Sequence, residues 1–112
     1  MFFSKLFKTS SYQDKVTLLA PSEFNAAIQK KGCQLIDVRT PNEYAAGTIQ
    51  KAKNLNIFDR ATFKKEAEKM DKTAPVYLFC QSGNRSRTAS KTLIEMGFST
   101  VFDLKGGYSS WR

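Results

Sequence analysis

The sequence contains no histidine and only two cysteines, Cys33 and Cys80, among its 112 residues. Without histidine, the chain cannot form a Ser-His-Asp triad, a Cys-His dyad or a histidine-ligated metal site. Two cysteines without a CxxC pair exclude a disulfide-rich scaffold, and we expect neither a metal nor another cofactor. Any nucleophile of this protein must therefore be activated by a group other than imidazole.

The sequence also lacks an apolar run approaching the roughly 20 residues that a membrane span needs. Lys5 and Lys8 interrupt the apolar stretch at the start of the chain, which is unlike the h-region of a signal peptide. The apolar residues there have the spacing of a short amphipathic helix, although we expect residues 1–12 to be a tail ahead of a single domain over residues 13–112. With no export signal and two unpaired thiols, we expect a cytoplasmic protein.

Acidic residues are few, since 10 Asp and Glu stand against 18 Lys and Arg, which gives a net charge of +8. The basic residues are scattered along the chain and do not form a stripe with aromatic residues, so we expect no binding of nucleic acid. The positive charge favours the approach of small anions.

Short apolar runs alternate with segments of helical period from residue 16 onwards. Strands are expected at residues 16–19, 35–38, 53–57, 75–79 and 101–104. Helices are expected around residues 24–28 (ending by Gly32), 63–70 (capped by Asp59) and 89–96 (ending at Gly97). Strands separated by helices of this length predict an α/β domain, with a mostly parallel sheet of about five strands and helices on both faces.

Cys80 directly follows the strongest predicted strand, at the sheet edge where open parallel sheets bind ligands. The polar loop after it comprises Gln81, Ser82, Gly83, Asn84, Arg85 and Ser86 and leads into a helix. We expect Gly83 to take a positive φ, the loop amides and the helix start to converge on the sulfur, and Arg85 to add a positive charge. A free thiol, with a pKa of about 8.5, is only a few per cent thiolate at neutral pH. Such a loop therefore makes Cys80 the candidate nucleophile.

Cys33 has no such loop beside it, and we expect it to be a packing residue. The alternative is a resolving thiol for Cys80, which requires the two cysteines to be close in space.

The length of the loop distinguishes two kinds of cysteine chemistry. Phosphatases of the tyrosine-phosphatase type have histidine before the cysteine and arginine six positions after it. Here Phe79 precedes Cys80, and the sixth position is Ser86, with Arg85 and Arg87 on either side. A loop one residue shorter suits a sulfur atom carried on cysteine as a persulfide, whose terminal anion the backbone N–H groups would hold.

Three segments of the chain form motifs, D-V-R-x3-E-Y-x2-G from Asp37 to Gly47, C-x-x-G-x-R-S from Cys80 to Ser86, and L-x-G-G-x3-W from Leu104 to Trp111. In this order and spacing, they resemble the motifs of the rhodanese-like sulfurtransferases in their single-domain form. Ala52, Asn54 and Leu55 continue the first segment. The chain departs from the family at Thr48, where histidine is usual, and at Lys51, where glycine is common.

The resemblance implies a sulfurtransferase that moves a sulfane sulfur from thiosulfate or a persulfide donor to a thiophilic acceptor through a Cys80 persulfide. Residues 81–86 would bind the donor, with Arg85 attracting its negative charge. Asp37, Arg39 and Glu43 are expected to form a salt-bridged brace, and acid–base catalysis is the alternative for them.

The implied partners are a small anionic sulfur donor such as thiosulfate and a thiol or protein persulfide acceptor. We expect a monomer with no stable membrane insertion. The alternative function is a sulfur carrier or partner-binding module that turns over small molecules slowly. Phosphatase or arsenate reductase activity is disfavoured by the length of the loop.

Overall fold

The computed structural model of the chain describes residues 14–111. The elements of this part follow in the order β1 (Val16–Leu19), α2 (Pro21–Ile28), β2 (Gln34–Asp37), α3 (Pro41–Ala46), β3 (Lys53–Asn54), α4 (Arg60–Ala67), β4 (Val76–Phe79), α5 (Asn84–Glu95), β5 (Val101–Leu104) and the 3-10 turn η1 (Tyr108–Ser110). The tail expected at residues 1–12 lies outside the described residues.

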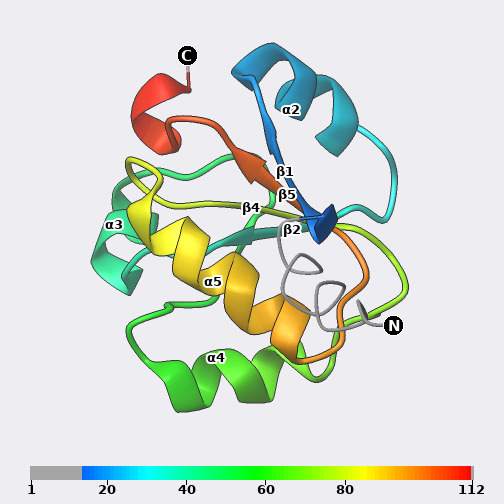
Figure 1. Cartoon of the computed structure of the whole chain (residues 1–112). Helices are drawn as coiled ribbons and strands as arrows, with labels where there is room; N and C mark the ends of the chain where they lie inside the picture. Colours follow the sequence, from blue (N-terminus) through cyan, green and yellow to red (C-terminus); the bar gives the residue numbers. More distant parts are fainter. Residues whose placement is uncertain (1–13, 112) are drawn as a thin grey trace.

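The five strands form one sheet in the order β1-β5-β4-β2-β3, in which every neighbouring pair is parallel (Figure 1). This arrangement confirms the predicted α/β class and the parallel sheet. Because all strands run the same way, their carboxyl ends meet at one edge, and β4 brings Cys80 to the middle of that edge.

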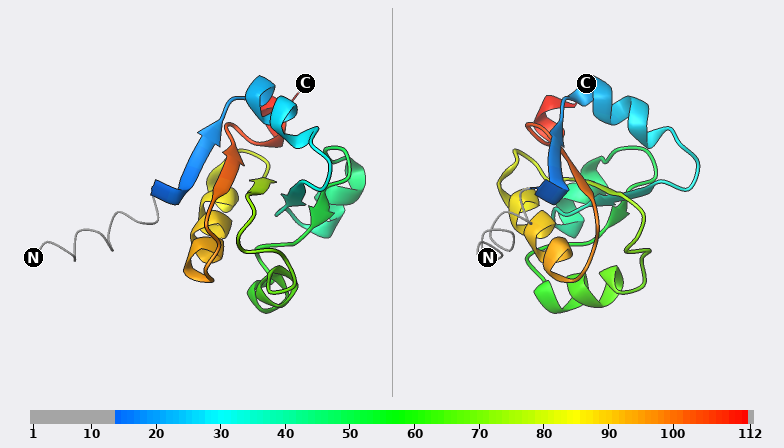
Figure 2. Two further views of the ribbon diagram at one scale, coloured as in Figure 1. Left: turned by 90° about the vertical axis from the view of Figure 1, so that its right-hand side faces the viewer. Right: turned by 45° about the vertical axis from the view of Figure 1, so that its right-hand side comes forward.

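Helices cover both faces of the sheet, as expected (Figure 2). Val76 and Leu78 of β4 belong to a core that also contains Phe63 of α4 and Leu93 of α5. The alternate residues of β4 face the second core, which contains Phe24 of α2 and is joined by Tyr108 and Trp111 from the end of the chain. The sheet is thus packed on both of its faces.

Helix α3 was not predicted, although it begins with a capping box formed by Thr40 and Glu43. Thr40 Oγ1 accepts a hydrogen bond from the Glu43 N–H at 3.3 Å, and the Glu43 carboxylate accepts one from the Thr40 N–H at 3.0 Å. Pro41 occupies the first helical position, where its missing N–H costs nothing. The helix escaped the periodicity analysis because it is short and buries no residue.

No helix within residues 14–111 has both the length and the apolar character to cross a lipid bilayer.

Candidate active site

Cys80 is the first residue after β4 and lies against the loop that leads to α5. It is 1% exposed, and its Sγ accepts a hydrogen bond from the Gly83 N–H, with an N···S distance of 3.0 Å. Gly83 has φ +115°, a conformation that residues with a Cβ rarely adopt, so the expected positive φ is confirmed. The geometry directs a backbone N–H of the loop at the sulfur.

The loop is shorter than the sequence suggested, because α5 begins at Asn84. Gly83 is the N-cap, and Asn84, Arg85 and Ser86 form the first turn of the helix. The N–H groups of a first turn have no acceptor within their helix, and they lie at the positive end of its dipole. The segment after Cys80 thus combines a three-residue turn with an unsatisfied helix start, an arrangement that favours anions.

Arg85 forms a bidentate ion pair with Glu43. Its two terminal nitrogens donate to the two carboxylate oxygens at 2.7 and 3.0 Å, and its guanidinium lies 5.4 Å from the centre of the Phe58 ring. The hydrogen bonds from Arg85 lower the pKa of Glu43 to about 2. Glu43 therefore braces the loop through Arg85 and not through Arg39, and its carboxylate offsets the charge that was expected to attract the donor.

Arg39 and Asp37 form a second, buried ion pair behind the loop. Arg39 Nε and Nη2 donate to the two oxygens of Asp37 at 3.0 and 2.8 Å, and both residues are at most 2% exposed. Burial alone would lower the pKa of Arg39, but its hydrogen bonds and ion pair with Asp37 reverse the effect and raise that pKa. Arg39 Nη1 also donates to Gln81 Oε1 at 3.0 Å, which connects this pair to the residue after Cys80.

Two residues without a predicted role at the site, Thr48 and Tyr108, complete the surroundings of this pair. Thr48 Oγ1 donates to Asp37 Oδ2 at 2.8 Å, so the residue that departs from the family pattern contributes to the brace. The Arg39 guanidinium lies 4.3 Å from the centre of the Tyr108 ring and donates to the Gly47 carbonyl at 2.7 Å. Their roles depend on contacts that no local pattern indicates.

The segment Gly106–Trp111, here called the strap, binds the main chain of the loop. The N–H groups of Tyr108 and Ser109 donate to the carbonyls of Cys80 and Gln81 at 2.7 and 3.0 Å. A Cβ on Gly107 would lie 2.6 Å from both of these carbonyl oxygens. The second glycine of the pair therefore allows the strap to approach the loop closely.

Ser86 and Asp103 form a buried polar contact that the sequence analysis did not single out. Ser86 Oγ lies 3.1 Å from the Gly83 carbonyl oxygen and 3.0 Å from Asp103 Oδ2. Burial raises the pKa of Asp103, which is 4% exposed, to about 6. The feature of the sequence that could have pointed to this contact is Asp103 itself, an acidic residue inside the apolar run of residues 101–104.

Cys33 lies at the opposite edge of the sheet from Cys80. It precedes β2, whose Gln34 pairs with Val76 at the start of β4, whereas Cys80 follows the end of β4. This places the two thiols about 15 Å apart along the strands, much farther than a disulfide allows. The alternative of a resolving thiol is therefore wrong for this fold, and Cys33 packs half-buried against the second core.

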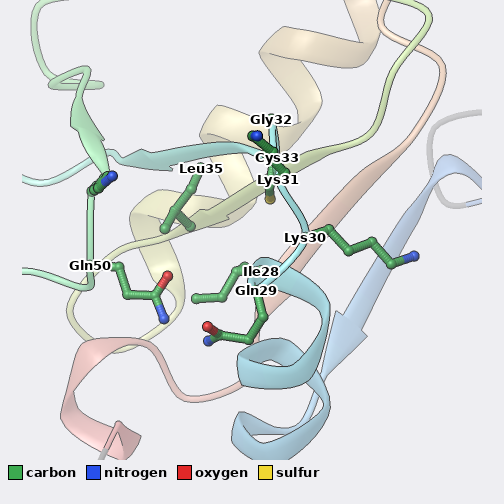
Figure 3. A pocket seen from close by; sticks show the side chains of 9 residues that line it. Ile28, Gln29, Lys30, Lys31, Gly32, Cys33, Leu35 and Gln50 are labelled. Carbon is green, nitrogen blue, oxygen red and sulfur yellow. The ribbon is translucent and has the colours of Figure 1, made fainter.

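A hollow of about 450 Å³ lies at the edge that holds Cys33 (Figure 3). Ile28, Leu35 and Gln50 line it, together with lysines such as Lys30, whose ammonium points away from Gln50 in this view. Burial raises the pKa of the Cys33 thiol, against the opposing effect of Lys30. The effect of burial is the larger of the two, so the surroundings of Cys33 disfavour the thiolate, which is the reactive form.

Among residues 14–111, no three Cys, Asp or Glu side chains are placed to hold a metal ion. Two of the acidic residues near the loop are ion-paired, Asp37 with Arg39 and Glu43 with Arg85.

Comparisons with known proteins agree with the fold. A family model described as a rhodanese-like domain matches residues 20–112. The chain is 38% identical over 101 residues to YqhL of Bacillus subtilis, covering 89% of this chain and 76% of YqhL. It is 37% identical over 92 residues to the thiosulfate sulfurtransferase GlpE of Pseudomonas fluorescens, covering 82% of each. The solved structure of the human single-domain sulfurtransferase TSTD1 matches with a TM-score of 0.71 and 27% identity, covering 84% of this chain and 93% of that one.

Proposed function

The chain belongs to the rhodanese-like domain family, and from this premise we propose that it is a sulfurtransferase that carries sulfur on Cys80. Two proteins that it resembles, GlpE and TSTD1, are named as sulfurtransferases. The observation that carries the proposal is the 3.0 Å hydrogen bond from the Gly83 N–H to Cys80 Sγ at the start of α5. A backbone hydrogen bond to the sulfur and a neighbouring helix N-terminus stabilise negative charge on the sulfur atoms that react.

In the first step, the Cys80 thiolate attacks the outer sulfur of thiosulfate. A sulfur–sulfur bond forms to Cys80, the bond to the sulfonate group breaks, and sulfite leaves with the electron pair of that bond. The product is a persulfide, Cys80–S–S⁻, so the total charge is unchanged. The N–H groups of the turn and of the first turn of α5 are the proposed donors to its terminal anion.

In the second step, a thiophilic acceptor attacks the terminal sulfur of the persulfide. The bond to the acceptor forms, the sulfur–sulfur bond breaks, and Cys80 returns as the thiolate. Cyanide gives thiocyanate by this route, and a thiolate acceptor becomes a persulfide. Two half-reactions that share one covalent intermediate predict ping-pong kinetics.

Access to the sulfur favours a small donor. Cys80 is 1% exposed, so a bulky disulfide meets more obstruction than thiosulfate does. Arg85 is paired with Glu43, and we therefore assign the attraction of the anion to the backbone N–H groups and the net charge of +8, with Arg85 fixing the start of the helix.

We also propose that residues 13–112 act as one monomeric unit in the cytoplasm. The two thiols are unpaired and far apart, which suits a reducing compartment. Leu18 and Phe58 are the exposed large hydrophobic residues of the described part, too few for the apolar core of a stable dimer. Sedimentation equilibrium tests the state of association.

The test compares Cys80→Ser with Cys33→Ser in the release of thiocyanate from thiosulfate and cyanide. We expect Cys80→Ser to lose at least about a hundredfold in kcat/KM, because a hydroxyl cannot carry the sulfur as a persulfide. Cys33→Ser should retain most of the activity, since this residue lies at the far edge of the sheet. Full activity in Cys80→Ser would refute the assignment.

Mass spectrometry of the intact protein after thiosulfate treatment separates the enzyme from a sulfur carrier. We expect an added sulfur, about 32 Da, on the wild type and on Cys33→Ser but not on Cys80→Ser, because thiolate reactivity selects the site. An adduct that cyanide removes only slowly would favour the carrier. No adduct and no turnover would favour a partner-binding module.

A further inference from the structure

Asp103 is a buried carboxyl group that the proposed reaction does not use. It lies on β5, between Leu18 of β1 and Leu78 of β4 in the register of the sheet. Its Oδ2 is 3.0 Å from Ser86 Oγ, and its Oδ1 has no hydrogen-bond partner in the part of the chain that the structure describes. Within the described residues, the hydrogen bond of this carboxyl group therefore leads toward the active-site loop.

The Ser86 hydroxyl has one hydrogen and two neighbouring acceptors. Its oxygen lies 3.1 Å from the Gly83 carbonyl oxygen and 3.0 Å from the Asp103 carboxyl group. One hydroxyl hydrogen cannot serve both. Both contacts are hydrogen bonds at the same time only when Asp103 is protonated and donates to Ser86, which then donates to Gly83.

We propose that Asp103 is a positioning residue that controls, through the Ser86 hydroxyl, how firmly Gly83 is held beside the Cys80 sulfur. When Asp103 releases its proton to solvent, the Ser86 hydrogen turns to the carboxylate and the Gly83 carbonyl loses this donor. Gly83 is the residue whose N–H binds Cys80 Sγ, so the state of the carboxyl group reaches the reactive atom within three contacts. The consequence for catalysis rests on the proposed function, whereas the hydrogen-bond exchange does not.

The exchange falls in an accessible pH range. Burial raises the pKa of Asp103 to about 6, while the Ser86 hydrogen bond and the Arg87 charge, both from α5, oppose the shift. In the described part of the chain, the residues paired with Asp103 on β1 and β4 are the leucines Leu18 and Leu78. The chain has no histidine, so no imidazole titrates in the same range.

Nuclear magnetic resonance of the full chain tests the exchange directly. The Gly83 carbonyl shares its peptide group with the Asn84 nitrogen, so the Asn84 amide resonance reports on the hydrogen bond from Ser86. We expect this resonance and the Asp103 side-chain carboxyl carbon to shift together, with a common midpoint near pH 6. A midpoint for Asp103 below about pH 5, near its ordinary range, would overturn the proposal.

The ionisation of Asp103 could change the Asn84 resonance through the Ser86 hydroxyl or through its charge alone, and two variants separate these effects. In Ser86→Ala, the resonance of the Asp103 carboxyl carbon should still titrate. The pH-dependent change in the Asn84 amide resonance should fall by at least about half, because the hydroxyl that connects Asp103 with the Gly83 carbonyl is removed. In Asp103→Asn, the transition at Asn84 should disappear. An Asn84 transition of full size in Ser86→Ala would overturn the proposal, and Asp103→Asn provides a second test if that variant does not fold.

The activity of Asp103→Asn gives the functional readout. The side-chain amide that this substitution introduces can donate to Ser86 at every pH, whereas Asp103 can donate only when it is protonated. In this variant, Ser86 therefore keeps its hydrogen bond to the Gly83 carbonyl at every pH. We therefore expect the kcat/KM of Asp103→Asn, divided by that of the wild type, to rise about threefold or more from pH 5 to pH 8. This is the size of effect that follows from the loss of one hydrogen bond in the wild type. A constant ratio would refute the catalytic consequence. A wild type without sulfurtransferase activity would refute the proposed function, and the resonance test would still decide the exchange.

Discussion

Arg39 connects more parts of the site than any other residue described above. One buried guanidinium binds the Asp37 carboxylate, the Gly47 carbonyl and the Gln81 side chain, and it stacks on the Tyr108 ring. Lysine could not replace it, since its ammonium has neither the planar fork nor the number of donors that these partners use. The environment of the loop thus depends on a residue that touches no reacting atom.

Asp103→Asn is expected to stabilise the folded protein at pH 8 and to leave its stability nearly unchanged at pH 4. The carboxyl group has a pKa of about 6 in the fold and about 3.9 in an unfolded chain. As the pH rises, the unfolded chain loses this proton first, so the contribution of the group to stability is full below pH 4 and is lost through pH 6. The loss amounts to roughly 3 kcal/mol, about 1.4 per pH unit.

Urea unfolding at the two pH values measures this difference. Asp71→Asn is the matched control, because hydrogen bonds from Thr73 lower the pKa of Asp71. Its carboxylate favours the fold above its ordinary pKa, so its replacement should not stabilise the protein at pH 8. If Asp103→Asn raised the free energy of unfolding equally at pH 4 and pH 8, the ionisation of Asp103 could not be what destabilises the wild type.

Among the elements, the strap has the most direct effect on the site. It donates two backbone hydrogen bonds to the carbonyls of Cys80 and Gln81, which fixes the main chain on both sides of the peptide after the nucleophile. Helix α3 acts from the other side, through Glu43 and its ion pair with Arg85. The turn is therefore held between two short segments that lie far from it in the sequence.

Gly107→Ala is expected to destabilise the protein by about 3 kcal/mol, which combines left-handed strain with a steric clash. The new Cβ would meet the Cys80 and Gln81 carbonyl oxygens at 2.6 Å, at a residue with φ +66°. We also expect activity to fall, because the strap must withdraw from the loop. Thermal unfolding and the thiocyanate assay measure the two effects.

Gly32→Ala is the control for the backbone strain alone. Gly32 has φ +78°, but apart from its chain neighbours no atom of the described residues lies within 4 Å of the added Cβ. Gly32→Ala should lower the free energy of unfolding by only about 1–2 kcal/mol and should retain the thiocyanate-forming activity. Equal costs in the two variants would show that the clash contributes nothing.

Strand and helix positions were predictable where they depend on local pattern. β1 and β5 coincide with the apolar runs at residues 16–19 and 101–104, and Asp59 caps α4 as expected, accepting from the Thr62 N–H. The partners of the charged residues were not predictable, because Glu43 and Arg85 are 42 positions apart and meet only through the order of the strands. For the same reason, the expected brace grouped Glu43 with its sequence neighbours Asp37 and Arg39 and did not include Arg85.

At the scale of the whole molecule, the net charge of +8 creates a field that favours anions at the site. We expect salt to weaken this effect, since the screening length falls from about 30 Å at 0.01 M to about 3 Å at 1 M. In Cys33→Ser, iodoacetate should alkylate Cys80 progressively more slowly as salt is added, by several-fold over this range. Uncharged iodoacetamide is the matched control and should respond little.

A ratio of the two alkylation rates that does not change with salt would contradict this prediction. It would mean that carboxylates near the loop, Glu43 foremost, cancel the long-range field at the sulfur. The donor would then be selected by the backbone N–H groups alone.

The strap also contains the single tryptophan of the sequence. The backbone N–H of Trp111 donates to the Tyr108 carbonyl at 3.0 Å, and the indole ring meets the Phe24 ring of α2 edge-on, with 6.1 Å between ring centres. Because the chain has one indole, fluorescence excited selectively in the indole band, where tyrosine does not absorb, originates at the segment that binds the main chain beside the nucleophile. The protein therefore carries an intrinsic fluorophore with which undocking of this segment can be followed in real time without a label.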